Sequence, residues 1–189
     1  PGTCLMDAFD EALSHPPGSV DRVLIATAAI DAATAHPLVL VGGGAQAVHT
    51  GPPRLTDIDL VGVFDAADEA ALLDLGFQRD GRHLVLQRGG NTIAMEVPDD
   101  TLEGGDQPIR VDTVAGVALV ISATDLLADR IRQATDLTAA TRSEAAILAA
   151  AVGHTVDWDE LRRRAAAEAA ADPFLSPFPE LVEQFAAGI

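Results

Sequence analysis

Two apolar segments in the first third of the chain constrain its fold more than any other feature. The first, residues 38–41, runs directly into three consecutive glycines. This pattern predicts a buried strand that ends in a tight turn, with a helix starting at about residue 45. The second, residues 57–63, begins by alternating acidic and apolar side chains, which predicts a strand that is buried on one face. Together the two segments predict a β-sheet with helices packed against it.

Two acidic side chains on the second segment point to divalent-cation chemistry. Asp57 and Asp59 are two residues apart, so a strand projects both side chains from the same face. Carboxylates held that close repel each other, which makes a buried structural role costly. A hard cation such as Mg²⁺ removes this repulsion and also binds phosphate oxygens. The alternative is that both carboxylates are solvated on the open face of an edge strand.

The glycines indicate where a phosphate group would bind. They are Gly42, Gly43 and Gly44. Because they lack side chains, their backbone N–H groups can approach a phosphate closely, and the positive end of the following helix favours its negative charge. An ordinary strand-to-helix turn is the alternative interpretation.

The rest of the pattern predicts an α/β (α+β) chain with a mixed β-sheet flanked by helices. We expect helices at residues 4–13, 19–35, 66–75, 124–137, 141–152, 157–171 and 180–187, and further strands at residues 83–88, 92–97, 109–111 and 117–121. The strands at 83–88 and 92–97 flank turn residues and form a hairpin. We therefore divide the chain into a core, residues 1–123, and a helical C-terminal region, residues 124–189, that packs on it. The arginines at positions 162–164 are expected on a helix surface.

The order of these motifs resembles the nucleotidyltransferase superfamily, which has the polymerase-beta-like fold. The residues that carry the resemblance are Val41-Gly42-Gly43-Gly44 and then Arg54-Leu55-Thr56-Asp57-Ile58-Asp59-Leu60. In motif order the resemblance covers residues 38–121, and it is strongest between residues 38 and 63. The motif has the form found in the minimal nucleotidyltransferases of bacteria and archaea, including those related to the AbiEii-type toxins.

The resemblance implies a set of site residues and a reaction. A third carboxylate lies on a later strand in the family, and the matching residue here is Glu96, where the family usually has aspartate. Asp57, Asp59 and Glu96 would hold Mg²⁺ or Mn²⁺, and the nucleotide-binding residues would be Gly42, Gly43, Gly44, Arg54 and Thr56. The implied reaction moves a nucleoside monophosphate from an NTP such as ATP to an acceptor hydroxyl, by in-line attack on the α-phosphorus with pyrophosphate leaving.

Two other functions stay open at the level of sequence. A silent nucleotide-binding or regulatory domain would keep the fold without turnover, and the glycine at a position where the family often has serine favours it. A toxin–antitoxin component would act together with a protein or tRNA partner. The acceptor itself, whether a small molecule, a tRNA or a protein, is not determined by the sequence.

The charge of the chain limits its partners. The formal net charge is −17, and all 12 basic residues are arginines. A charge this negative repels phosphate backbones at long range, so broad nucleic-acid binding is not expected. A local basic pocket for one nucleotide remains compatible with it.

The N-terminal residues and the hydropathy pattern predict a cytoplasmic protein with no membrane partner. Asp7, Asp10 and Glu11 occupy the region where a secretion signal needs a basic start and an apolar run. No apolar stretch approaches the roughly 18–20 residues that span a bilayer.

Overall fold

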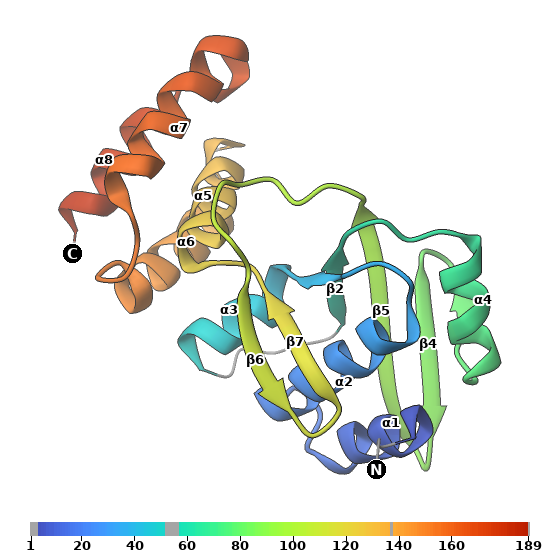
Figure 1. Ribbon diagram of the computed structural model, residues 1–189. Helices are drawn as coiled ribbons and strands as arrows, with labels where there is room; N and C mark the ends of the chain where they lie inside the picture. Colours follow the sequence, from blue (N-terminus) through green and yellow to red (C-terminus); the bar gives the residue numbers. More distant parts are fainter. Residues whose placement is uncertain (1–3, 52–56, 137, 189) are drawn as a thin grey trace. The chain divides into compact units, whose positions relative to one another are not determined.

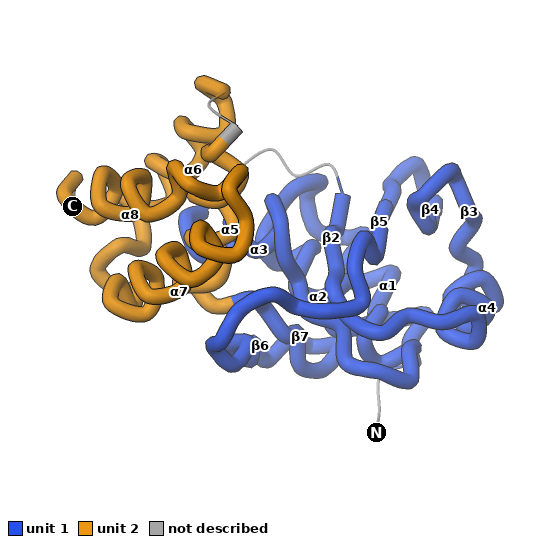
Figure 2. The backbone as a smooth tube through the Cα atoms, turned by 90° about the horizontal axis from the view of Figure 1, so that it is seen from above, with its two compact units in different colours: residues 1–121 blue, residues 122–189 orange. Residues whose placement is uncertain are grey.

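The computed structural model describes residues 4–51, 57–136 and 138–188. The chain forms two compact units, residues 1–121 and residues 122–189, which are coloured separately in Figure 2. Arg54 and Thr56, which we expect to contact the nucleotide, lie outside the described residues and stay predictions.

The first unit contains all the strands that the described residues form. Its elements, in chain order, are α1 (Leu5–Ser14), α2 (Val20–Ala33), β1 (Val39–Leu40), α3 (Gly42–Thr50), β2 (Ile58–Val61), α4 (Ala66–Asp74), β3 (Gln78–Asp80), β4 (His83–Arg88), β5 (Asn91–Asp99), β6 (Ile109–Thr113) and β7 (Gly116–Val120).

These strands make one mixed sheet of seven strands. Their order is β3-β4-β5-β2-β1-β7-β6. Strand β1 is parallel to β7 and β2 is parallel to β5, whereas the other neighbouring pairs are antiparallel. The sheet and its helices, drawn in Figure 1, confirm the predicted mixed α/β fold class. Strand β2, which carries Asp59, is the central strand of the sheet.

Helices α1 and α2 lie side by side and cover one face of the sheet (Figure 1). Residues 22–30 of α2 are buried without interruption, as expected of a helix enclosed within a core. Ser19 caps the start of this helix, since its side chain accepts a hydrogen bond from the Arg22 N–H. On α1, Phe9 packs edge-to-face against Phe77 with ring centroids 5.2 Å apart. The covered face takes up Ile58 and Leu60 of β2, which leaves the opposite face for Asp59.

Two local predictions differ from the structure. Helix α3 begins at Gly42 rather than near residue 45, so the glycines form its first turn instead of a turn before it. Strand β3 was missed because its three residues are polar and exposed, and therefore show no apolar alternation. A two-residue turn, Gly81 and Arg82, connects β3 to β4, since Asp80 pairs with His83.

Asp68 anchors the start of α4 to the segment that precedes β1. Its side chain is 2% exposed and accepts hydrogen bonds from the backbone N–H groups of Ala35, at 2.7 Å, and of Asp65, at 3.1 Å. Asp65 reciprocates by accepting from the Asp68 N–H, which completes a capping box. The Ala35 hydrogen bond is the main cause that lowers the pKa of Asp68 below its ordinary value.

We expect Asp68→Ala to lower the free energy of unfolding by about 2–3 kcal/mol at pH 7, because two backbone donors lose their acceptor. The folded-state pKa of Asp68 is below its unfolded value, so the carboxylate stabilises the fold above an unfolded pKa of about 4. This stabilisation is lost as the pH falls through the folded pKa. Urea titrations at pH 7 and pH 3 should therefore show a smaller difference at pH 3. Asp74→Ala, at an exposed position of the same helix, is the control.

The second unit is helical throughout its described residues. It consists of α5 (Ala123–Gln133), a short 3-10 helix (Ala134–Asp136), α6 (Ala139–Val152), α7 (Trp158–Ala171), a second 3-10 helix (Pro173–Leu175) and α8 (Phe178–Ala187). Side chains of Ser122, Thr138 and Asp157 accept backbone hydrogen bonds at the starts of α5, α6 and α7. Within the described part of the chain, no helix is both long enough and apolar enough to cross a bilayer.

The arginines at positions 162–164 correct the prediction of a surface run. Arg162 and Arg163 do pair at the surface, with Glu183 and Glu160 respectively. Arg164 instead points inward to Asp125, and the two side chains are 15% and 1% exposed. Helical periodicity explains the difference, because three consecutive residues cover almost a full turn and one of them must face the neighbouring helix.

Replacing Arg164 by methionine should destabilise the second unit by about 2–3 kcal/mol, because Asp125 would remain buried without this partner. Arg163→Met removes an exposed pair of the same type and should change stability much less, because exposed ion pairs contribute little. Thermal unfolding of the two variants separates a buried ion pair from a surface one. Equal shifts in the two melting temperatures would contradict the structural assignment.

Candidate functional site

Neighbouring strands bring the predicted carboxylates to one face of the sheet. In the parallel pair β2–β5, Asp59 lies opposite Glu96 and Ile58 lies opposite Met95. Ile58 and Met95 are buried on the side of the helices, so Asp59 and Glu96 project from the other side. Asp57 directly precedes β2 and comes close to Glu96, since both lie within reach of one common histidine.

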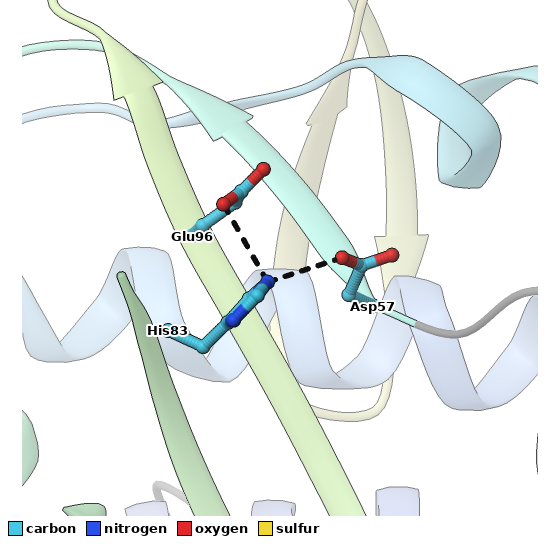
Figure 3. Close-up of side chains that lie close together, drawn as sticks. All are labelled: Asp57, His83 and Glu96. Atoms are coloured by element: carbon cyan, nitrogen blue, oxygen red, sulfur yellow. Dashed lines mark ion pairs between the residues drawn. The ribbon is translucent and has the colours of Figure 1, made fainter. Parts of the chain in front are cut away.

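That histidine is His83, the first residue of β4. Its Nε2 is 3.3 Å from Asp57 Oδ2 and 3.5 Å from Glu96 Oε2. Figure 3 shows the imidazole between the two carboxylates, each contributed by a different segment of the sheet. One potential ligand atom from each of the three residues lies within 4.8 Å of the other two. The sequence analysis did not single out His83. The available signal was the predicted hairpin of residues 83–88 and 92–97, because the register that pairs Leu84 with Met95 places the preceding residue, His83, beside Glu96.

Arg82 supplies a positive charge to the Glu96 carboxylate. Its Nε lies 2.7 Å from Glu96 Oε2, and its side chain is 75% exposed whereas that of Glu96 is 11% exposed. Moving this mostly solvated side chain away from Glu96 requires little free energy, since surface ion pairs contribute about 0–1 kcal/mol. Glu96 is therefore balanced by positive charge and still accessible to a competing cation.

The start of helix α3 adjoins Asp59. Gly42 has a φ of +59°, and a Cβ built on it would lie 2.2 Å from Asp59 Oδ2. A backbone hydrogen bond links the same two segments, because the Val41 N–H donates to the Asp59 carbonyl oxygen at 2.9 Å. Glycine is thus required at position 42 both for its backbone conformation and for the approach of a carboxylate. The first N–H groups of α3, which have no partners within the helix, therefore lie next to the face of the sheet that carries Asp59.

The other two glycines have different surroundings. A Cβ on Gly44 would meet Leu40 Cδ1 at 2.8 Å and Val23 Cγ1 at 3.3 Å, so this glycine lets α3 pack closely on the core. Gly43 is half-buried in the first turn of the helix. Near the other end of the helix, His49 Nε2 lies 2.9 Å from the Ile121 carbonyl oxygen, which ties α3 to the end of β7.

The donor set fits a divalent cation. Asp57 and Glu96 offer carboxylate oxygens and His83 offers an imidazole nitrogen, all from one face of the sheet. Oxygen and nitrogen donors of these types are common protein ligands of Mg²⁺, Mn²⁺ and Zn²⁺. Asp59 adds a carboxylate between this group and the α3 N-terminus. A polyanion such as a triphosphate would meet backbone N–H groups on one side and cation ligands on the other.

Comparison with known proteins identifies the fold. The chain matches no protein-family model and no curated protein sequence. Among solved structures it is similar to an antigenic nucleotidyltransferase-like protein from Paracoccidioides brasiliensis, with a TM-score of 0.56 over 86% of this chain and 93% of that one, at 16% identity. The fold is nucleotidyltransferase-like. Because the sequence identity is low, this similarity concerns the fold, and the site must be judged from its own residues.

A second similar structure is that of the antibiotic-resistance factor ANT(2'')-Ia. It shares 14% identity over 97% of this chain and 88% of that one, with a TM-score of 0.36. A score of that size is too low to support an argument about the present chain.

Proposed function

We propose that this chain is a nucleotidyltransferase that moves a nucleoside monophosphate from an NTP to an acceptor hydroxyl, with Mg²⁺ or Mn²⁺ as its metal. The observation that carries the proposal is the position of Asp59. This residue lies opposite Glu96 in the sheet. Its carboxylate also lies so close to Gly42, at the start of α3, that a side chain on residue 42 would clash with it. Cation ligands and a phosphate-binding helix start are thereby adjacent in a nucleotidyltransferase-like fold.

Each residue has a defined task in this proposal. Asp57, Asp59 and Glu96 would hold the divalent cation, which supplies positive charge for the phosphates and the leaving pyrophosphate. Gly42, Gly43 and Gly44 present the first N–H groups of α3 to the phosphate oxygens. Arg54 and Thr56 lie outside the described residues and are proposed as further nucleotide contacts.

Glu96 is the proposed acceptor of the hydroxyl proton. Its carboxylate is largely buried but faces the same side of the sheet as Asp57 and Asp59. The acceptor oxygen forms a bond to the α-phosphorus, the bond from that phosphorus to the pyrophosphate oxygen breaks, and the hydroxyl proton passes to Glu96. The protein contributes mainly by orienting the reactants and by stabilising developing charge.

A silent nucleotide-binding domain is the second candidate. Glycine occupies positions 42–44 throughout, so these positions provide no hydroxyl contact to a phosphate. A toxin–antitoxin component related to the AbiEii-type toxins is a further alternative. It rests on the resemblance carried by the motif at residues 54–60, and it would act together with a protein or tRNA partner. The net charge of −17 favours a small acceptor or a partner that supplies positive charge.

Two measurements test the proposed function. Isothermal titration with each non-hydrolysable NTP, with and without Mg²⁺, should show cation-dependent nucleotide binding. Pyrophosphate release from the matching NTP should then appear with one acceptor pool, drawn from small metabolites, tRNA or protein. Cation-dependent binding without release in any pool would favour the silent domain. Absence of cation-dependent binding to every NTP would overturn both candidates.

A further inference from the structure

We propose that His83 is a ligand of the same cation as Asp57 and Glu96, and that the site therefore binds a first-row transition-metal ion, such as Mn²⁺, Co²⁺ or Zn²⁺, more tightly than Mg²⁺. The inference rests on the cation site of the proposed function and deepens it by naming the metal class. It adds a nitrogen donor to a site otherwise made of carboxylates.

The position of the imidazole supports ligation. Nε2 is nearly equidistant from one oxygen of Asp57 and one of Glu96, at 3.3 and 3.5 Å. The imidazole nitrogen thus lies close to both carboxylates and not to one alone, as Figure 3 shows, and the three potential ligand atoms lie within 4.8 Å of one another. A small movement of each side chain is enough to bring all three to the metal–ligand distances of about 2.0–2.2 Å that Zn²⁺ requires.

The backbone holds His83 in this place. The β4–β5 register pairs Leu84 with Met95, and its continuation puts His83 beside Glu96 on the open face. The two-residue turn at Gly81 and Arg82 fixes the start of β4, because Asp80 pairs with His83 across it. The imidazole is also 28% exposed, so it is confined by its neighbours without being sealed in the core. A ligand on a sheet is positioned more accurately than one on a long loop.

The donor set decides the expected metal. Imidazole nitrogen is a good ligand for Zn²⁺ and for other late first-row ions, whereas Mg²⁺ prefers oxygen ligands and keeps several of its waters. With two carboxylates and one imidazole, the site combines charge neutralisation with a nitrogen donor. Removing His83 should therefore weaken transition-metal binding much more than Mg²⁺ binding.

The competing interpretation is a charge-balancing role for His83. In that case an imidazolium ion would neutralise Asp57 and Glu96 much as Arg82 neutralises Glu96. A bound cation would then displace the imidazole instead of coordinating it. The two roles make opposite predictions about whether a histidine nitrogen is bonded to the metal.

Cobalt provides a probe that reports this bond without any assay of activity. In wild-type protein titrated with Co²⁺, proton NMR should show a strongly shifted, solvent-exchangeable imidazole N–H signal from the ring nitrogen opposite the metal. His83→Gln and His83→Asn should abolish this signal and weaken Co²⁺ binding by at least about ten-fold, while Mg²⁺ binding changes by less than about three-fold. His154→Gln, at an exposed position in the second unit, should leave the signal and the affinity unchanged.

The outcomes separate this inference from the proposed function. Binding of Co²⁺ with no shifted imidazole signal, or with a signal that survives both His83 variants, would overturn the ligand role and leave the carboxylate site standing. Failure of both Co²⁺ and Mg²⁺ to bind, with or without a non-hydrolysable NTP, would overturn the proposed cation site and the inference with it. Circular dichroism of the variants verifies that they are folded.

Discussion

Asp59→Asn is expected to reduce nucleotidyl transfer by at least about 10³-fold, equivalent to about 4 kcal/mol of transition-state stabilisation. The amide keeps the size of the side chain and its place beside Gly42, so the fold is retained. What is lost is one negative ligand on the face that also carries Glu96. Because removal of one of several neighbouring carboxylates relieves repulsion, the melting temperature should be equal to that of wild type or higher.

The measurement combines turnover with stability. Pyrophosphate release and cation-dependent NTP binding are compared with the melting temperature of each variant. Asp112→Asn makes the same chemical change at an exposed position on β6 of the same sheet, and it should leave both properties unchanged. A structural role for Asp59 would produce the reverse result, with a lower melting temperature and turnover reduced only in proportion to the unfolded fraction.

Gly42→Ala should reduce transfer by about 10²-fold or more, because its Cβ displaces the Asp59 carboxylate by a distance that orientation-dependent catalysis does not tolerate. A built Cβ lies 2.2 Å from Asp59 Oδ2, and the positive φ adds backbone strain of about 1–2 kcal/mol. The variant should therefore lose both activity and some stability.

Gly51→Ala separates these two effects. Gly51 ends the same helix with a φ of +86°, and a Cβ there would have no neighbour within 4 Å among the described residues. Its alanine variant should show the loss of stability from backbone strain without the clash at the site. If Gly51→Ala and Gly42→Ala reduce NTP turnover equally, the close approach of Gly42 to Asp59 has no functional role.

Local pattern was sufficient for most of the helices and strands. The Ser19 cap, the alternation at Asp57 and Asp59, and the turn between residues 88 and 91 each depend on neighbours within a few positions. Strand β3 had no such signal, since its residues are polar and exposed and its pairing with β4 supplies the evidence that it is a strand. The wrong start of α3 has a related cause. Its first residue has a positive φ that only its tertiary surroundings explain.

In the candidate site too, some features follow from local sequence and others depend on the tertiary pairing of strands. The spacing of Asp57 and Asp59 predicts that both carboxylates project from one face of a strand, although in the structure β2 begins at Ile58 and Asp57 lies directly before it. The pairing of β2 with β5 was needed to put Glu96 opposite Asp59, and a separate hairpin was needed to bring His83 to Asp57. Arg164 was misassigned for the same reason, because its partner Asp125 is distant in sequence.

By itself, the sequence determined most of the periodic elements and the alternation of acidic and apolar side chains over residues 57–60, because these properties depend on backbone geometry over a few residues. Only the tertiary structure decided which third carboxylate approaches them, that a histidine lies between two of the acidic groups, and which glycine touches Asp59. Strand order and register set these contacts, and neither is encoded in local spacing.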